Sequence, residues 1–209
     1  MNRRQVVCGW RVCVVTDARL ARGHSHAEVV RAAIAGGADV IQFRDKDLSD
    51  DVFHAAALEL CVICRAHNVP LVINDRVDIA VAVGADGVHV GQGDLPAMQA
   101  RARIGDRILG VSASTVAEAH AACAAGADYL GVGPVFDAQG TKPDARPPIG
   151  LAGLSEICAA VDVPVMAIGG IQAANCRQVF AAGAKCIAVV SAVVAAPDIT
   201  CAVRVLKAG

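Results

Sequence analysis

The segment Val83-Gly84-Ala85-Asp86-Gly87-Val88 is the most informative about the fold, because close variants of it recur along the chain. In each variant a helical pattern reaches a glycine, and an apolar run of strand type begins three residues later. A glycine after a helix supplies the left-handed residue that ends it, and a continuously apolar run is typical of a strand that is buried on both faces. The pattern indicates repeated βα units. The other variants occupy residues 35–41, 125–130 and 182–187.

Read outward from these units, the chain shows eight strand patterns separated by amphipathic or alanine-rich helical patterns. Eight alternations in one domain favour the α/β class and a single-domain (β/α)8 TIM barrel over residues 1–209. The alternative is an open, doubly wound sheet, which would follow if one of the shorter strands were false, but no glycine-rich dinucleotide fingerprint follows the first strand. The predicted strands are residues 11–16, 39–43, 70–74, 87–90, 108–112, 129–133, 164–168 and 186–190.

Composition limits the class of partner. The chain has 209 residues, of which 55% are hydrophobic and 19% charged, and its formal net charge is −1. The basic residues are scattered along the chain and the net charge is close to zero, which argues against a nucleic-acid partner. The apolar runs are too short for a membrane span. No secretory signal pattern opens the chain. We therefore expect a cytoplasmic protein that binds small molecules, and the sequence leaves a homo-oligomer open.

The nine cysteines are odd in number and scattered through predicted helices and strands. In a chain large enough to bury its own core, they are interpreted as reduced core residues. Cys61 and Cys64 have the spacing of a redox or zinc motif, but they fall inside a helical pattern without a second pair. Structural packing is the favoured interpretation for both.

Two strands in succession deliver an aspartate at their carboxyl ends. Asp75 follows the strand at 70–74, and Asp94 follows the strand at 87–90 across a glycine-rich turn. Carboxylates in this position suit Mg²⁺, a hard cation that binds one or two carboxylates together with phosphate oxygens. The alternative is that both are helix N-caps, because a helical pattern follows each. Their shared position favours the metal site.

The second predicted strand runs out into alternating polar residues. Gln42, Arg44 and Lys46 would point the same way on an extended strand end and would present two cations and an amide to one ligand. Arginine, lysine and Mg²⁺ together suit a diphosphate. The alternative is surface ion pairing of these cations with Asp45 and Asp47.

Two later segments also suit anionic ligands. Residues 137–149 form a long polar connection, and such loops are often lids. Lys142 in this loop would close over an anionic substrate, unless the loop is simply solvated. Gly169-Gly170 after strand seven and Val190-Ser191 after strand eight lie where these barrels bind phosphate through backbone N–H groups. A purely structural glycine turn is the alternative there.

At these residues the chain closely resembles the thiamine phosphate synthase family, and the match spans nearly its whole length. The motifs that carry the resemblance are highly specific when taken together. They are Val14-Val15-Thr16-Asp17, Gln42-Phe43-Arg44-Asp45-Lys46, Ile73-Asn74-Asp75-Arg76-Val77-Asp78, Gly87-Val88-His89-Val90-Gly91-Gln92-Gly93-Asp94, Gly110-Val111-Ser112, Gly131-Val132-Gly133-Pro134-Val135-Phe136, Thr141-Lys142 and Ile168-Gly169-Gly170-Ile171.

The resemblance implies a reaction between two small phosphorylated substrates. A hydroxymethylpyrimidine diphosphate joins a thiazole phosphate, and diphosphate leaves first in a dissociative step, so the site would need charge stabilisation rather than a covalent nucleophile. It also implies Mg²⁺ on Asp75 and Asp94, and catalytic roles for Arg44, Lys46, Ser112 and Lys142. The implied pyrimidine diphosphate ligands are Gln42, Phe43, Arg44, Asp45, Lys46, Asn74, Ser112 and Lys142, and the implied thiazole phosphate ligands are Gln139, Gly140, Thr141, Gly170, Val190 and Ser191.

The chain departs from the family pattern at one implied contact. The family usually shows Thr-x-Thr-Lys where this chain has Gln139-Gly140-Thr141-Lys142. A glutamine amide can still donate to phosphate, but the contact of the first threonine is in question.

Two rival functions stay open at this point. A thiazole tautomerase of the same fold is expected to carry an acid-base histidine after strand six, where this chain has Gly133-Pro134. A non-catalytic phosphate-binding barrel would need neither the carboxylates nor Lys142.

Overall fold

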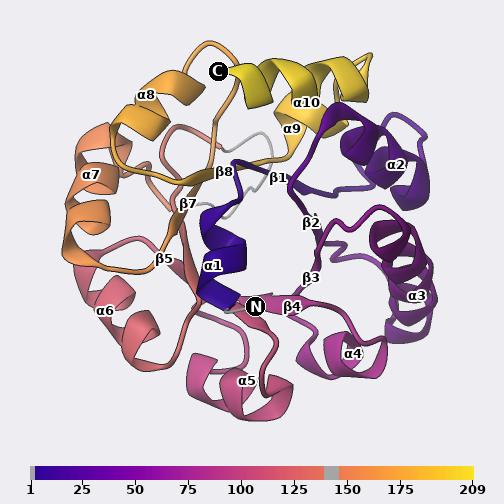
Figure 1. Ribbon diagram of the computed structural model, residues 1–209, viewed down its shortest axis with the longest axis horizontal. Helices are drawn as coiled ribbons and strands as arrows, with labels where there is room; N and C mark the ends of the chain where they lie inside the picture. The colour runs from indigo at the N-terminus through magenta and orange to yellow at the C-terminus, as the bar shows by residue number, and fades with distance from the viewer. Residues whose placement is uncertain (1–2, 139–145) are drawn as a thin grey trace.

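A computed structural model describes residues 3–138 and 146–209 and contains eight parallel strands closed into a barrel (Figure 1). Each strand pairs with the next in the chain, and β8 pairs with β1. The closed barrel confirms the predicted fold and excludes the open sheet, and every strand lies within one residue of its predicted bounds. The strands are β1 Val12–Val15, β2 Val40–Phe43, β3 Leu71–Asn74, β4 Gly87–Val90, β5 Ile108–Ala113, β6 Tyr129–Val132, β7 Val165–Ile168 and β8 Cys186–Val189.

Helices surround the barrel and bury its outer face (Figure 1). A large apolar cluster fills the space between strands and helices, while a second one lies inside the barrel. The helices are α1 Arg3–Cys8, α2 His26–Gly36, α3 Asp50–Ala66, α4 Val77–Ala82, α5 Ala97–Ile104, α6 Val116–Ala124, α7 Gly150–Ala160, α8 Cys176–Ala181, α9 Ser191–Val194 and α10 Ile199–Ala208. The sequence patterns did not predict α1 and α9.

The recurring glycines end helices as predicted. Gly37, Gly84, Gly126 and Gly183 all have positive φ, between 68° and 108°. Left-handed backbone of this kind strongly favours glycine, because it has no Cβ to clash. Each of these turns feeds directly into the next strand of the barrel.

The aspartates of the recurring stretch lock the strand starts together. The Asp39 carboxylate accepts hydrogen bonds from the backbone N–H groups of Arg11 and Val12. Asp86 accepts from Leu71 N at 2.9 Å, and Asp128 accepts from Leu109 N at 2.9 Å. In each case the carboxylate satisfies an amide at the start of the neighbouring strand, so it helps to set the register.

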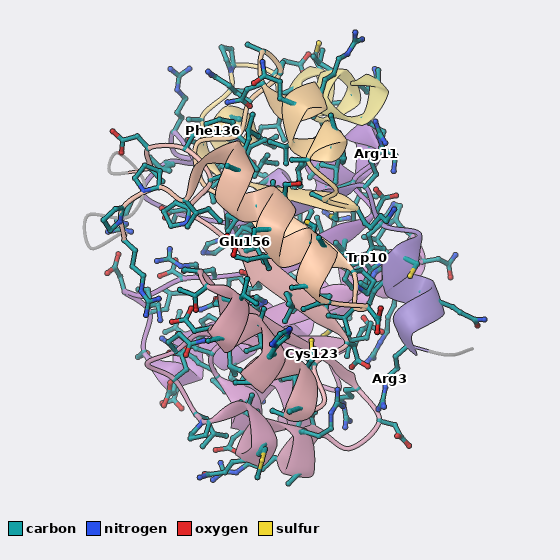
Figure 2. The ribbon with its side chains drawn as sticks, turned by 90° about the vertical axis from the view of Figure 1, so that its left-hand side faces the viewer. Arg3, Trp10, Arg11, Cys123, Phe136 and Glu156 are labelled. Atoms are coloured by element: carbon teal, nitrogen blue, oxygen red, sulfur yellow. The ribbon has the colours of Figure 1, made fainter. Side chains whose placement is uncertain are left out.

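Helix α1 closes the amino-terminal end of the barrel. Arg3 forms an ion pair with Asp128, and Trp10, which follows the helix, is 4% exposed and meets Tyr129 edge-on inside the barrel at 5.7 Å between ring centroids. Figure 2 shows Arg3 and Trp10 at one end of the molecule and Phe136, which follows β6, toward the other. The carboxyl ends of the strands, where the candidate site residues were predicted, therefore lie at the end opposite to α1.

All nine cysteines are free thiols. Cys61 and Cys64 are buried inside α3, and burial raises the pKa of both thiols, which fits packing rather than redox chemistry. The interpretation as core residues is wrong for Cys8 and Cys201, because both are exposed.

A search of the described residues for a helix of membrane-spanning length and hydropathy finds none.

Candidate active site

Polar side chains gather where the strands end, on the side of the barrel away from α1. Asp75 directly follows β3, and Asp94 follows β4 after a short turn. Because β3 and β4 are hydrogen-bonded neighbours, with Asn74 opposite His89, the two aspartates belong to adjacent positions on this rim. The fold thus brings these two residues to the same end of the barrel, as predicted.

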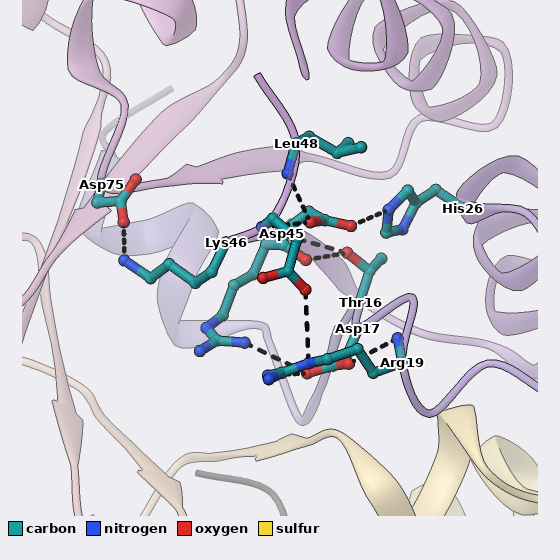
Figure 3. Close-up of polar contacts among 10 residues, drawn as sticks. Thr16, Asp17, Arg19, His26, Asp45, Lys46, Leu48 and Asp75 are labelled. Atoms are coloured by element: carbon teal, nitrogen blue, oxygen red, sulfur yellow. Dashed lines mark hydrogen bonds and ion pairs between the residues drawn. The ribbon is translucent and has the colours of Figure 1, made fainter. Parts of the chain in front are cut away.

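Asp75 is not a helix cap. The N-cap of α4 is Arg76, which makes no capping bond through its side chain. The Asp75 backbone has φ of 54°, a left-handed conformation that is uncommon outside glycine. Its carboxylate forms an ion pair with Lys46 across the rim, and its side chain is 17% exposed (Figure 3). The turn therefore directs this carboxylate toward the end of β2 instead of toward its own helix.

Asp94 is not a helix cap either. The N-cap of α5 is Pro96, and no side chain caps that helix. Instead, Asp94 Oδ2 accepts a hydrogen bond from Gly91 N at 2.7 Å, which closes the tight turn after β4. A Cβ on Gly91 would lie 3.2 Å from this carboxylate oxygen and 3.8 Å from Ser112 Oγ. The glycine thus lets Asp94 and Ser112 share one side of the rim.

The chemistry of this pair suits Mg²⁺. Within residues 3–138 and 146–209, no group of three or more histidine, cysteine or acidic side chains is arranged to hold a metal. Mg²⁺ is often held by one or two carboxylates and completed by water and substrate phosphate oxygens. Asp75 and Asp94 offer that number of carboxylates, so they would hold a metal that arrives with a phosphorylated ligand.

Lys46 and Arg44 form ion pairs with acidic residues, but not with the two that the alternative interpretation named. Lys46 pairs with Asp75, and Arg44 Nη1 lies 3.3 Å from Asp17 Oδ2. The alternative of pairing with Asp45 and Asp47 does not occur among the described ion pairs. Both cations face acidic groups on the rim, and Figure 3 shows Lys46 reaching toward Asp75.

The end of β1 fixes the position of Arg44. Thr16 Oγ1 accepts a hydrogen bond from Arg44 N and donates one to Arg44 O, each at 3.1 Å. Asp17, which is 3% exposed, also binds Arg19. Thr16 and Asp17 are functional neighbours of Arg44 that the residue-level reasoning missed, although polar residues at the end of the first strand were a signal for them.

Gln42 does not lie alongside Arg44 and Lys46. It is 6% exposed and lies near the Tyr129 side chain inside the barrel. The expectation that these three side chains share one direction fails, because β2 ends at Phe43 and strand alternation does not continue beyond it. Phe43 is fully buried against Phe53, so its side chain has no surface for a ligand and only its backbone could contribute.

Asp45 organises the loop that carries the two cations. Its carboxylate accepts hydrogen bonds from the backbone N–H groups of Asp47 and Leu48 and bonds His26 Nε2 at 2.9 Å (Figure 3). Burial acts to raise the pKa of Asp45, but these hydrogen bonds and the nearby imidazole outweigh it and hold the pKa below its ordinary value. Asp45 thus stays ionised and shapes the loop after β2.

Ser112 is joined to a buried histidine. Its Oγ lies 2.9 Å from His89 Nε2, and His89 Nδ1 lies 3.1 Å from the Tyr129 hydroxyl. Burial lowers the pKa of His89 to about 4, although the charge of Asp94 acts in the opposite direction. Asn74, the last residue of β3, is half-buried at the same rim. His89 was missed as a site residue, and a histidine within an apolar strand was the available signal.

The predicted phosphate segment after β7 and β8 is built for close backbone contact. Gly169 and Gly170 have φ of 100° and 64°, and a Cβ on Gly170 would lie 2.6 Å from Asp137 O. Packing against residues after β6 thus already requires glycine here, as the structural alternative proposed. Val190 and Ser191 begin the short helix α9 immediately after β8.

Four predicted ligands lie outside the described residues. They are Gln139, Gly140, Thr141 and Lys142.

Known proteins resemble this chain over nearly its whole length. The family model described as thiamine monophosphate synthase matches residues 12–193. A thiamine-phosphate synthase of Chloroflexus aurantiacus is 56% identical over 202 residues, which cover 97% of this chain and 93% of that protein. One of Roseiflexus castenholzii is 52% identical over 196 residues, with 93% and 86% covered.

A solved structure agrees with these sequence relatives. The thiamine phosphate pyrophosphorylase of Pyrococcus furiosus superposes with a TM-score of 0.90 at 39% identity, covering 99% of this chain and 96% of that one.

Proposed function

Because this chain belongs to the thiamine monophosphate synthase family, whose members are transferases, we propose the two substrates that it joins. They are 4-amino-2-methyl-5-(diphosphooxymethyl)pyrimidine and 4-methyl-5-(2-phosphooxyethyl)thiazole, and the products are thiamine phosphate and diphosphate. One observation carries the proposal: Lys46 and Asp75 meet across the rim, with Arg44 held close by on the same loop as Lys46. This arrangement suits a diphosphate and a divalent cation together.

The diphosphate is the group that the rim would bind most tightly. Arg44 offers a planar donor fork to phosphate oxygens, and it is already oriented by Thr16 and Asp17. Lys46 would exchange its contact with Asp75 for a phosphate oxygen. Ser112 would donate a hydrogen bond, and Lys142 would add a third cation, as the family resemblance implies.

Mg²⁺ would be held by Asp75 and Asp94 and would neutralise charge on the departing diphosphate. Bond cleavage leaves a pyrimidinylmethyl cation, and the thiazole nitrogen then forms the new carbon–nitrogen bond. The residues of this chain stabilise charge and hold the two substrates in contact, which are the main contributions that such a step requires. The phosphate of the thiazole would bind at Gly170, Val190 and Ser191, with Gln139, Gly140 and Thr141 from the loop.

The tautomerase alternative expects an acid-base histidine directly after β6, and the described rim has none at that position. Gly133-Pro134 follows β6. His26 is bonded to Asp45, and His89 is bonded to Ser112 and Tyr129. These hydrogen bonds occupy the imidazoles in holding the loop and the barrel interior.

A product assay tests the proposed function. Purified protein is incubated with both substrates and Mg²⁺, and the mixture is analysed by mass spectrometry. We expect thiamine phosphate only when both substrates are present. Bound substrates that yield no thiamine phosphate would contradict the proposal, and isomerisation of a thiazole substrate without the pyrimidine would support the tautomerase instead.

A cytoplasmic location is also proposed, since nine free thiols suit a reducing compartment.

A further inference from the structure

Three charged side chains meet where β1 and β2 run out onto the rim. Asp17 Oδ2 lies 3.4 Å from Arg19 Nη2 (Figure 3) and 3.3 Å from Arg44 Nη1, so two guanidinium groups share one carboxylate oxygen. The register of the two strands pairs Val15 with Gln42. Two residues further on, the same register brings Asp17 alongside Arg44. The contact therefore follows from the pairing of the strands and joins two loops of the rim.

The two oxygens of the Asp17 carboxylate have separate partners. Oδ1 accepts a hydrogen bond from the backbone N–H of Arg19 at 3.0 Å, which closes the turn after β1. Oδ2 contacts the two guanidinium groups. Because Asp17 is only 3% exposed, its charge needs such partners to be stable in the folded protein. One oxygen thus shapes the loop, and the other holds the arginines.

Arg44 is held at its backbone and at its guanidinium. Thr16 Oγ1 accepts from Arg44 N and donates to Arg44 O, each at 3.1 Å, and Asp17 contacts the guanidinium. A guanidinium has five N–H donors, and the hydrogen bond to Asp17 is made by Nη1. Donors therefore remain for phosphate oxygens. A side chain that is already oriented also loses less freedom when it binds them.

The charge of Asp17 would by itself repel an anionic ligand. Arg19 contacts the same oxygen, and its side chain is 53% exposed, against 19% for Arg44. Its Nε also lies 3.8 Å from Asp47 Oδ2, on the loop that carries Lys46. The positive charge of Arg19 offsets the negative charge of Asp17. Asp17 can then hold Arg44 without presenting an uncompensated negative charge to the ligand.

We infer that Asp17 is a positioning residue that holds the Arg44 guanidinium toward the diphosphate, and that Arg19 supports this contact by neutralising Asp17. The inference rests on the proposed function for the identity of the ligand. The family resemblance implies no role for Asp17 or Arg19, although Thr16 and Asp17 belong to one of its motifs. Diphosphate binding therefore depends on the end of β1 as well as on the end of β2.

Calorimetric titration with inorganic diphosphate and Mg²⁺ measures this contact without turnover. In Asp17→Asn, the amide oxygen can keep the bond to the Arg19 backbone, while the NH₂ group faces the two guanidinium groups and cannot accept from them. We expect diphosphate to bind about tenfold more weakly. Loss of a negative charge alone would strengthen anion binding, so a loss of affinity identifies positioning. Equal or tighter binding in Asp17→Asn would overturn the inference.

A double variant shows whether Asp17 acts through Arg44. In an Arg44→Ala background, Asp17→Asn should not weaken diphosphate binding further, because the guanidinium that it positions is gone. The same loss of affinity in both backgrounds would contradict the inference.

Steady-state kinetics separate positioning from a merely structural role. Asp17→Asn should raise KM for the pyrimidine diphosphate about tenfold and leave KM for the thiazole phosphate within about twofold. Asp128→Asn is the matched control, because that carboxylate is 4% exposed and binds Arg101 and Arg3 at the other end of the barrel. It should lower stability and leave both KM values unchanged. Equal rises of both KM values in Asp17→Asn would show a structural role only.

Arg19→Ala tests the same contacts at an exposed position, and it decides the inference if Asp17→Asn does not fold. Without Arg19, Asp17 is uncompensated and competes with the ligand for Arg44, so diphosphate should bind about threefold more weakly. Arg31→Ala removes an exposed arginine of α2 and should leave the affinity unchanged. Equal affinities in these two variants would overturn the inference.

The proposed function and this inference fail separately. Wild-type protein that binds diphosphate but forms no thiamine phosphate would refute the function, while the titrations would still decide the role of Asp17. Product formation together with unchanged diphosphate affinity in Asp17→Asn would refute the inference alone. A wild type that binds no diphosphate would refute both.

Discussion

The backbone conformation of Asp75 sets the direction of its carboxylate. Its left-handed backbone, with φ of 54°, is unfavourable for a residue with a Cβ, although aspartate tolerates it better than most. Strain of this kind concentrates at functional sites. Here it turns the carboxylate away from α4 and toward Lys46. The helix-cap hypothesis would have required the opposite orientation.

Neutralising either aspartate tests the metal proposal. Asp75→Asn or Asp94→Asn should reduce kcat by roughly 100-fold or more, the scale of losing a charge-stabilising group in the transition state. The Mg²⁺ concentration needed for half-maximal rate should rise. Thermal unfolding should change little in Asp75→Asn, since the side chain is partly exposed. Asp78→Asn, on the exposed surface of α4, is the matched control and should retain wild-type turnover. Wild-type metal dependence in both variants would remove the metal role.

His89 should make the fold sensitive to acid. Its pKa is about 4 in the folded protein, against about 6.5 as the ordinary value, so the unfolded chain binds more protons between these limits. Stability is therefore complete above about pH 6.5 and declines as the pH falls toward 4, by on the order of 3 kcal/mol. Asp45, whose pKa is lowered, adds its own loss below that window. Urea unfolding at a series of pH values should show a flatter dependence for His89→Gln, and an unchanged slope would contradict this assignment.

At the scale of elements, the recurring Gly-x-Asp unit both ends a helix and binds the neighbouring strand. The glycine ends the helix, and the aspartate two residues later binds the first amides of the neighbouring strand. Asp128 is an example of this carboxylate contact: it is 4% exposed and also binds Arg101 Nη2 at 2.5 Å. In the fourth copy Lys185 replaces the aspartate, so the carboxylate contact is lost and the backbone bond that all four copies make remains, here from Lys185 N to Val165 O.

Removing the Asp128 carboxylate should destabilise the barrel. Asp128→Ala leaves the Leu109 amide and the Arg101 guanidinium without their carboxylate, which should cost roughly 3 kcal/mol. Equilibrium urea unfolding measures this loss. The control is Asp106→Ala, which alters an exposed aspartate bound to Arg3 and should change stability by less than about 0.5 kcal/mol. Equal effects in the two variants would show that Asp128 is an ordinary surface charge.

The sequence predicted the elements that have strong periodic signals. All eight strands follow from apolar runs, four of them directly after the recurring glycines, and the long α3 follows from its amphipathic pattern. Helices α1 and α9, of six and four residues, were not predicted. Helix α1 is held mainly by contacts distant in sequence, such as that of Arg3 with Asp128. No local pattern could reveal such support.

The positions of the candidate residues at the strand ends were predicted from the sequence, but their side-chain directions were not. The barrel rim brings Asp75, Asp94 and Ser112 to neighbouring strand ends, and that follows from the topology alone. The directions of Gln42 and Arg44 depend on where β2 stops and on partners such as Tyr129 and Asp17. These partners come from distant strands, so spacing within one segment could not identify them.

At the scale of the whole molecule, the barrel has a sealed end and a reactive end. Trp10 and α1 seal the amino-terminal end (Figure 2). Trp10→Ala should lower the free energy of unfolding by about 3–5 kcal/mol, because it opens a cavity inside the barrel. Met98→Ala removes a side chain that is 70% exposed and should have little effect. At a temperature low enough for the Trp10→Ala variant to stay folded, its KM values for both substrates should equal those of the wild type. Large changes in KM in the folded variant would show that the two ends of the barrel are coupled.

We propose that the rim opposite α1 releases diphosphate as it joins the two substrates. This is tested by ³¹P NMR of wild-type protein with both substrates, recorded with and without Mg²⁺. We predict that diphosphate and thiamine phosphate appear in equal amounts, only with both substrates present, and that chelation of Mg²⁺ stops both. Diphosphate released without thiamine phosphate, or neither product while both substrates are bound, would contradict the claim.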